Sequence, residues 1–153
     1  MNMMRRVDLD QVRATAVEVR GALQDMPHEP FRGAKTYFPQ GLCEWASIAL
    51  AEVLAVRGLG DWTFVEMKLP SSLSGHAWRE LRDAEGRAVF TIDITLDQFK
   101  DFDSWYMGIE QSPARQRFSR LNFAGPWREW PVLENNKTFA PYAQMMVDFT
   151  TRG

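Results

Sequence analysis

The feature that most constrains the fold is a helical stretch that is apolar on almost every side. Residues 42–57 read LCEWASIALAEVLAVR, and Gly58 and Gly60 follow as a helix stop. The apolar stripe at helical spacing consists of Ala46, Leu50, Val53 and Leu54, widened by Ile48, Ala49, Ala51 and Ala55. A helix that is apolar on most sides lies inside a domain rather than on its surface. The rest of the chain is therefore expected to fold around this helix.

A second helix is predicted before the central one, over residues 9–25, with Asp8 as its N-cap. Its apolar positions fall on one face and are Val12, Ala16, Val19 and Leu23. Between the two helices, residues 26–41 are rich in proline and glycine, which predicts an irregular loop.

Strands are predicted after the central helix, over residues 62–69, 76–82 and 87–94. Residues 83–86, Asp-Ala-Glu-Gly, have the composition of a tight turn. A short helix is expected over 96–103, with Thr95 and Gln98 as a capping box, and a last helix over 139–149.

The order of elements predicts an α+β fold in which the central helix packs on a small antiparallel sheet. The length of 153 residues suits one domain, and no break in composition divides residues 1–153. Within that domain, residues 1–30 form an N-terminal helical extension. Residues 104–153 are an aromatic-rich segment, mostly loop before the last helix, with room for one short strand.

Composition argues against several classes of partner. The net charge of −2 and the pI of about 5.7 disfavour nucleic acid and anionic membranes, which both attract dense positive charge. No apolar run reaches the roughly 18 residues that span a membrane, and the N-terminus lacks the apolar core of a signal peptide. A single cysteine, Cys43, excludes an intramolecular disulfide and favours a cytoplasmic location, with non-classical secretion left open.

Cys43 stands where the apolar helix begins. The aligned peptide dipoles place partial positive charge at a helix N-terminus, so we expect the thiol pKa to be lowered there. The free N–H groups of the first turn could also stabilise an oxyanion that forms when a thiolate attacks a carbonyl. The alternative is that Cys43 is a small residue of the core.

Only two histidines, His28 and His76, could serve such a thiol as a base. His28 lies in a loop, whereas His76 opens a predicted strand and shares a face with Trp78 and Glu80. A two-residue loop after Asp83 would place Asp93 directly opposite His76, with Cβ atoms about 5 Å apart. Asp93 would then accept the Nδ1–H of the imidazole. A longer loop would shift this register, and a buried Asp–His pair without chemistry is the alternative.

The strings GLCEWAS, GHAWRE and TIDIT, in this order, resemble the papain-like and transglutaminase-like superfamily over roughly residues 37–103. The resemblance implies that Cys43 is the nucleophile, His76 the general base and acid, and Asp93 its orienting group. Gln40 is the implied second oxyanion donor, with Tyr37 as a competitor. The implied activity is acyl transfer from an amide bond of a protein or peptide, as in a peptidase, deamidase or transglutaminase, without a cofactor.

The sequence leaves open the role of its six tryptophans and two functions other than acyl transfer. The tryptophans could line a substrate groove, Trp78 among them, although packing in a core is their commoner role. A catalytically silent binding module would instead use Trp127, Trp130 and Phe139 as a docking patch. A metal site built from Cys43, His76 and Asp93 is disfavoured, because no closely spaced ligand pair is present. The sequence predicts no oligomeric state.

Overall fold

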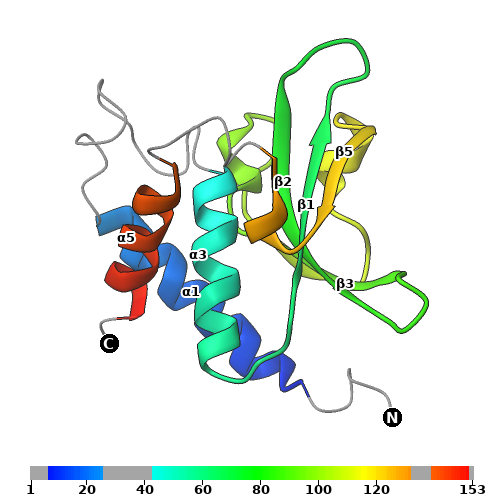
Figure 1. The fold of residues 1–153 in the computed structure, drawn as a ribbon. Coiled ribbons are helices and arrows are strands. Elements are labelled where there is room, and N and C mark those ends of the chain that lie inside the picture. Colours follow the sequence, from blue (N-terminus) through cyan, green and yellow to red (C-terminus); the bar gives the residue numbers. More distant parts are fainter. Residues whose placement is uncertain (1–6, 26–42, 132–138, 152–153) are drawn as a thin grey trace.

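A computed structural model describes residues 7–25, 43–131 and 139–151. The described residues form three α-helices, α1 (Leu9–Asp25), α3 (Cys43–Val56) and α5 (Phe139–Thr151), beside one antiparallel sheet. Figure 1 shows the helices grouped on one side, with α3 between α5 and the sheet. The fold is α+β, as the order of elements predicts.

The two long N-terminal elements follow the sequence pattern closely. Asp8 accepts the backbone N–H groups of Asp10 and Gln11 at 3.1 and 3.2 Å, which confirms it as the N-cap of α1. The predicted stripe of α1 is buried, and α3 is buried along most of its length. Helix α3 contacts α1, α5 and β2, so it is the central helix of the domain.

The sheet has five strands in the order β4-β3-β2-β1-β5, and every neighbouring pair is antiparallel. The three predicted strands are β1 (Thr63–Lys68), β2 (Gly75–Arg82) and β3 (Ala88–Asp93). The two edge strands are β4 (Tyr106–Gly108) and β5 (Arg120–Gly125). They arise from the segment expected to be mostly loop, so the prediction of at most one short strand there is wrong.

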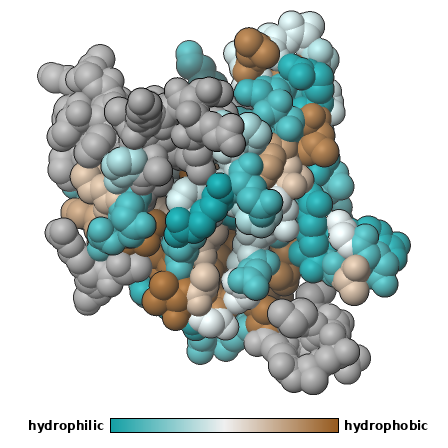
Figure 2. Space-filling model, in the orientation of Figure 1, coloured by the Kyte–Doolittle hydropathy of each residue, from teal (hydrophilic) through white to brown (hydrophobic). Residues whose placement is uncertain are grey.

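Both faces of the sheet are covered. The face toward the helices carries Phe64, Ala77, Leu81, Phe90 and Ile92, which join the core cluster of α1 and α3. Alternate residues of the same strands point the other way, and Val65, Met67 and Trp78 form a second cluster with Leu96, Ala114 and Phe118. Figure 2 shows hydrophilic residues over much of the visible surface, with hydrophobic ones in several separate places.

The β2–β3 hairpin differs from the predicted register. The backbone N–H of Asp83 donates to the carbonyl oxygen of Arg87, so residues 84–86 form the loop. Gly86 in this loop has a φ of +79°. A bulge between Leu81 and Arg82 then shifts the pairing so that Arg79 faces Ile92. The expectation that Asp93 lies directly opposite His76 is therefore wrong by two residues, which keeps both side chains on one face.

The segment after β3 is not α-helical over 96–103. A single 3-10 turn, η2 (Leu96–Gln98), replaces the expected helix, and the Thr95 side chain caps nothing. Gln98 uses its side-chain amide to bond Thr95 O at 3.2 Å instead of closing a capping box. Two further 3-10 turns, η3 (Pro113–Gln116) and η4 (Trp127–Glu129), flank β5. Among the described residues, no helix has the length and apolar character that crossing a membrane requires.

Candidate functional site

His76 and Asp93 form a hydrogen-bonded pair that is fully enclosed. The His76 Nε2 atom lies 2.9 Å from Oδ1 and 2.8 Å from Oδ2 of Asp93, and neither side chain is exposed. The pair forms at the end of β2 and β3, where the two residues stand diagonally on the ladder. With the Asp93 carboxylate as the acceptor of this contact, Nε2 is assigned as the protonated ring nitrogen. The expected contact through Nδ1 is therefore wrong, and Nδ1 is the ring nitrogen that faces away from Asp93.

Two further residues complete the hydrogen bonds of this pair. The Ser112 hydroxyl donates to Asp93 Oδ2 at 2.8 Å and accepts the N–H of Ala114 at 3.2 Å, which caps η3. The Gln98 amide nitrogen lies 3.3 Å from His76 Nδ1. Sequence reasoning missed both as site residues. The Ser112-Pro113 pair signals a helical turn, but nothing local in the sequence signals its contact with β3.

Aromatic rings enclose the imidazole on several sides. The ring centroids of Phe99, Trp78 and Phe118 lie 4.9, 5.7 and 5.8 Å from that of His76. Trp78 donates its indole N–H to Glu80 at 2.9 Å, and the Glu80 carboxylate also accepts hydrogen bonds from the guanidinium groups of Arg82 and Arg115. Trp78, proposed from the sequence as a substrate contact, is thus a buried wall behind the imidazole, at 1% exposure.

Cys43 is the first residue of α3 and is buried. Its thiol donates to the neighbouring Glu44 carboxylate, with Sγ and Oε2 3.3 Å apart. Burial, more than the adjacent charge of Glu44, raises the pKa of the Cys43 thiol well above its usual value. A backbone hydrogen bond from Ala77 opposes this pKa shift, and the charge of Asp93 adds to it. The expectation of a lowered pKa at the helix N-terminus is wrong in this conformation.

The three predicted catalytic residues are brought together only in part. His76 and Asp93 are paired, and Cys43 lies beside the backbone of Ala77, the residue after His76. Ala77 packs with Cys43 in the helix-side cluster, whereas the His76 ring packs against Trp78 on the other face of β2. Within the described part of the chain, the hydrogen-bond acceptor of the thiol is Glu44 rather than the imidazole. Gln40, Tyr37 and His28 lie outside the described residues.

The tryptophans mainly serve packing. Trp127 and Trp130 are 7% and 3% exposed. Their indole N–H groups donate to Glu52 and Glu66, respectively. A docking patch built on Trp127 and Trp130 is therefore wrong, and the third member of that hypothesis, the Phe139 side chain, lies outside the described residues. In the described ranges, no group of three His, Cys, Asp or Glu side chains is arranged to hold a metal ion.

No protein-family model, curated protein or solved structure matches the chain. Its function is therefore inferred below from the chemistry of its own residues.

Proposed function

We propose that this protein is a thiol-dependent acyl-transfer enzyme that acts on an amide bond of a protein or peptide. Cys43 is the nucleophile, His76 the general base and acid, and Asp93 the group that orients His76. The observation that carries the proposal is the buried His76–Asp93 pair, in which both carboxylate oxygens face Nε2. Because Asp93 holds the proton on Nε2, the lone pair that can accept a proton is on Nδ1.

The position of Cys43 supports the same assignment. Its place at the start of α3 puts it next to backbone N–H groups that make no bonds within the helix. The contact of its thiol with the backbone of Ala77 places it one residue along β2 from His76. The order of Cys43 at a helix start, His76 on β2 and Asp93 on β3 is the basis of the proposed papain-like or transglutaminase-like fold.

The proposed reaction needs no group from outside the chain except substrate and water. The thiol proton moves to His76 Nδ1, and the sulfur bonds the amide carbon. The C–N bond then breaks as His76 returns that proton to the leaving nitrogen, and a thioester remains on Cys43. Water attacks the thioester, gives its proton to His76, and releases the acid as the proton returns to sulfur. If an amine replaces water, a new amide forms.

The described conformation is the resting form of this cycle. The thiol is protonated and donates to Glu44, and the Gln98 amide faces Nδ1. The reaction requires the Gln98 amide to turn away and the thiol to leave Glu44, so that sulfur and Nδ1 face each other. The proposal therefore includes a rearrangement at the ends of β2 and β3 when substrate binds.

Two observations favour a second function, a catalytically silent protein-binding module. A buried thiol with a raised pKa is a weak nucleophile, and the imidazole is packed among three aromatic rings. In that case the His76–Asp93 pair would only stabilise the sheet. The two functions differ in whether Cys43 forms a covalent acyl intermediate.

Acylation by p-nitrophenyl acetate tests the enzyme directly, because its activated p-nitrophenolate leaving group lets it acylate a reactive thiol without recognition of a specific substrate. The chain has one cysteine, so an added acetyl group on sulfur identifies Cys43 in the intact mass. We expect a burst of p-nitrophenol and an acetylated protein. Cys43→Ala should abolish the burst, and His76→Gln should slow it by about 100-fold or more, the usual contribution of a general base.

Ser104→Ala is the matched control, because its hydroxyl is exposed and donates to the carbonyl oxygen of the next residue, Trp105. It should react like the wild type. A wild-type protein without a burst, or a Cys43→Ala protein that keeps one, would refute the enzyme and leave the binding module. Two product measurements then distinguish the enzyme classes. Release of ammonia from glutamine-containing peptides would indicate a deamidase, whereas the appearance of new peptide termini would indicate a peptidase. A working thiol also requires a reducing compartment, which fits the proposed cytoplasmic location.

A further inference from the structure

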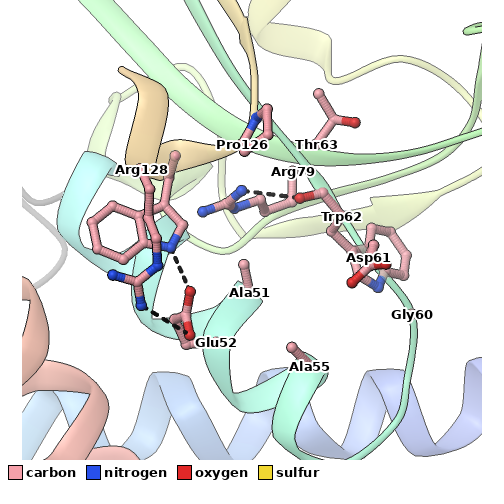
Figure 3. Close-up of a pocket in the computed structure, with 11 residues that line it drawn as sticks. Ala51, Glu52, Ala55, Gly60, Asp61, Trp62, Thr63, Arg79, Pro126 and Arg128 are labelled. Carbon is pink, nitrogen blue, oxygen red and sulfur yellow. Dashed lines mark hydrogen bonds and ion pairs between the residues drawn. The ribbon is translucent and has the colours of Figure 1, made fainter. Parts of the chain in front are cut away.

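A pocket of about 400 Å³ lies along the second half of α3, away from Cys43. Figure 3 shows it between α3, which contributes Ala51, Glu52 and Ala55, and the segments that carry Trp62, Pro126 and Arg128. A volume of this size suits a small molecule of drug-like dimensions. The pocket shares no residue with the candidate catalytic site.

Arg79 lines this pocket from β2 and is 1% exposed. Its Nε donates to Ser47 O at 2.9 Å, and its Nη1 donates to Trp62 O at 3.0 Å. Among the described residues, its Nη2 is buried and has no hydrogen-bond partner. Figure 3 shows the guanidinium pointing toward the side of the pocket where Glu52 and Arg128 lie. A buried donor without an acceptor is uncommon in folded proteins and indicates that something else supplies the acceptor.

The charge of Arg79 is also only partly compensated. The carboxylate of Glu52 already accepts the indole N–H of Trp127 and faces Arg128 Nη2 at 3.7 Å. Burial lowers the pKa of Arg79 to about 9, so the side chain is still charged near neutral pH, and Glu52 acts on it from a distance. The Phe64 ring, whose centroid lies 5.0 Å from Arg79 Cζ, offsets part of this charge. Among the described residues no carboxylate forms an ion pair with Arg79, so its burial is still costly, and a bound anion would offset that cost.

We propose that the pocket binds a small organic monocarboxylate, with one carboxylate oxygen accepting the hydrogen of Arg79 Nη2. The apolar body of the ligand lies against Ala51, Ala55 and Pro126. Phosphate fits the pocket less well, because Glu52 and the exposed Asp61 on its border repel a dianion. The evidence for this site comes from Arg79 and the pocket alone, so the proposal does not depend on the proposed acyl-transfer activity.

Benzoate is a suitable probe, because it combines one carboxylate with a flat apolar ring. Titration of the full chain, followed by the indole N–H signals in NMR spectra, should show saturable shifts at Trp62 and Trp127. Benzamide and inorganic phosphate at the same concentrations should bind at least tenfold more weakly. The titration extends to about 10 mM, the range in which weak small ligands saturate.

Two variants that narrow the pocket leave Arg79 in place. Ala51→Phe should weaken benzoate binding at least tenfold. If the Ala51→Phe protein does not fold, Ala55→Leu replaces it in the same measurement, with the same expected result. Val56→Phe places the same phenyl ring on α3 at a position 75% exposed and outside the pocket, so it should bind like the wild type. The proposal is overturned if benzoate does not bind up to the highest concentration, which would mean that water alone satisfies Nη2. Equal binding of phosphate, or unchanged binding in the folded pocket variant, would overturn it as well.

Discussion

His76 and Asp93 meet diagonally across the β2–β3 ladder rather than as directly opposed partners. The nearest directly opposed pair of the ladder joins Arg79 and Ile92, so both residues lie beyond it. The contact between the His76 and Asp93 side chains therefore links the two strands at this end. Ser112 adds a third contact from η3, with its hydroxyl on the Asp93 carboxylate.

Ser112→Ala should lower the free energy of unfolding by about 1–3 kcal/mol, the cost of leaving a buried acceptor unsatisfied. The hydroxyl is buried and serves both Asp93 and the N–H of Ala114, so two partners lose a bond. Urea unfolding measures the change. Ser104→Ala removes an exposed hydroxyl and should change the value by less than about 0.5 kcal/mol. Equal effects of the two substitutions would mean that Ser112 does not support Asp93.

Glu44→Gln should make Cys43 more reactive. The Glu44 charge and its hydrogen bond from the thiol both raise the pKa of Cys43, and glutamine removes the charge. Each unit by which the pKa falls increases the thiolate fraction about tenfold at a pH below that pKa. Iodoacetamide labelling, followed by intact mass, reports on Cys43 alone because it is the one cysteine. Glu18→Gln, on the exposed face of α1, is the matched control. A rate that falls or stays the same in Glu44→Gln would contradict the role of Glu44.

Arg79 should make stability rise with pH in the alkaline range. In the folded protein its pKa is lowered from its much higher ordinary value to about 9, chiefly by burial. Between these two values the unfolded chain binds more protons than the folded one, so the free energy of unfolding increases with pH. The contribution is absent below about pH 9, where both states are charged, and its slope is at most about 1.4 kcal/mol per pH unit.

Comparison with Arg79→Met isolates this effect from other groups that titrate. The stability of the wild type relative to Arg79→Met should increase from about pH 8 to about pH 10. Arg87→Met, at an exposed position of the β2–β3 loop, controls for the loss of one arginine. A difference between wild type and Arg79→Met that stays constant over this range would show that Arg79 keeps its proton throughout.

The parts of the fold with strong local signals were predictable from the sequence. The stripes of α1 and α3 and the Asp8 cap are local patterns, and the structure confirms them. The edge strands β4 and β5 were not predictable, because they are short and gain their order by pairing with β3 and β1. In the same way, the register of β2 and β3 depends on a bulge at Leu81 and Arg82, which alternation alone does not reveal.

The contact between His76 and Asp93 was predictable from the sequence, but the surroundings of the candidate site were less so. The pairing of His76 with Asp93 followed from a polar residue placed between Ile92 and Ile94, which requires a partner. The contacts of Ser112 and Gln98 with this pair were not predictable, because they arise from tertiary packing. The direction of the Cys43 pKa shift depends on tertiary packing as well. The sequence correctly places Cys43 at the start of a helix, but burial and the Glu44 charge, which raise the pKa, outweigh the effect of the helix dipole.

Gly75 is the position where the backbone before His76 leaves no room for a side chain. A Cβ atom there would lie 2.7 Å from the carbonyl oxygen of Met67, which is backbone of the adjacent strand β1. Gly75→Ala should therefore push β2 away from β1 and destabilise the protein by about 1–3 kcal/mol, in the range for overpacking. Gly21→Ala is the matched control, because its Cβ would meet nothing within 4 Å and the position lies inside α1. There alanine should stabilise by about 0.5–1 kcal/mol, since it loses less conformational freedom in a helix than glycine. Thermal and urea unfolding should give opposite signs for the two substitutions, and the same sign for both would show that the close approach at Gly75 does not constrain the strand that carries His76.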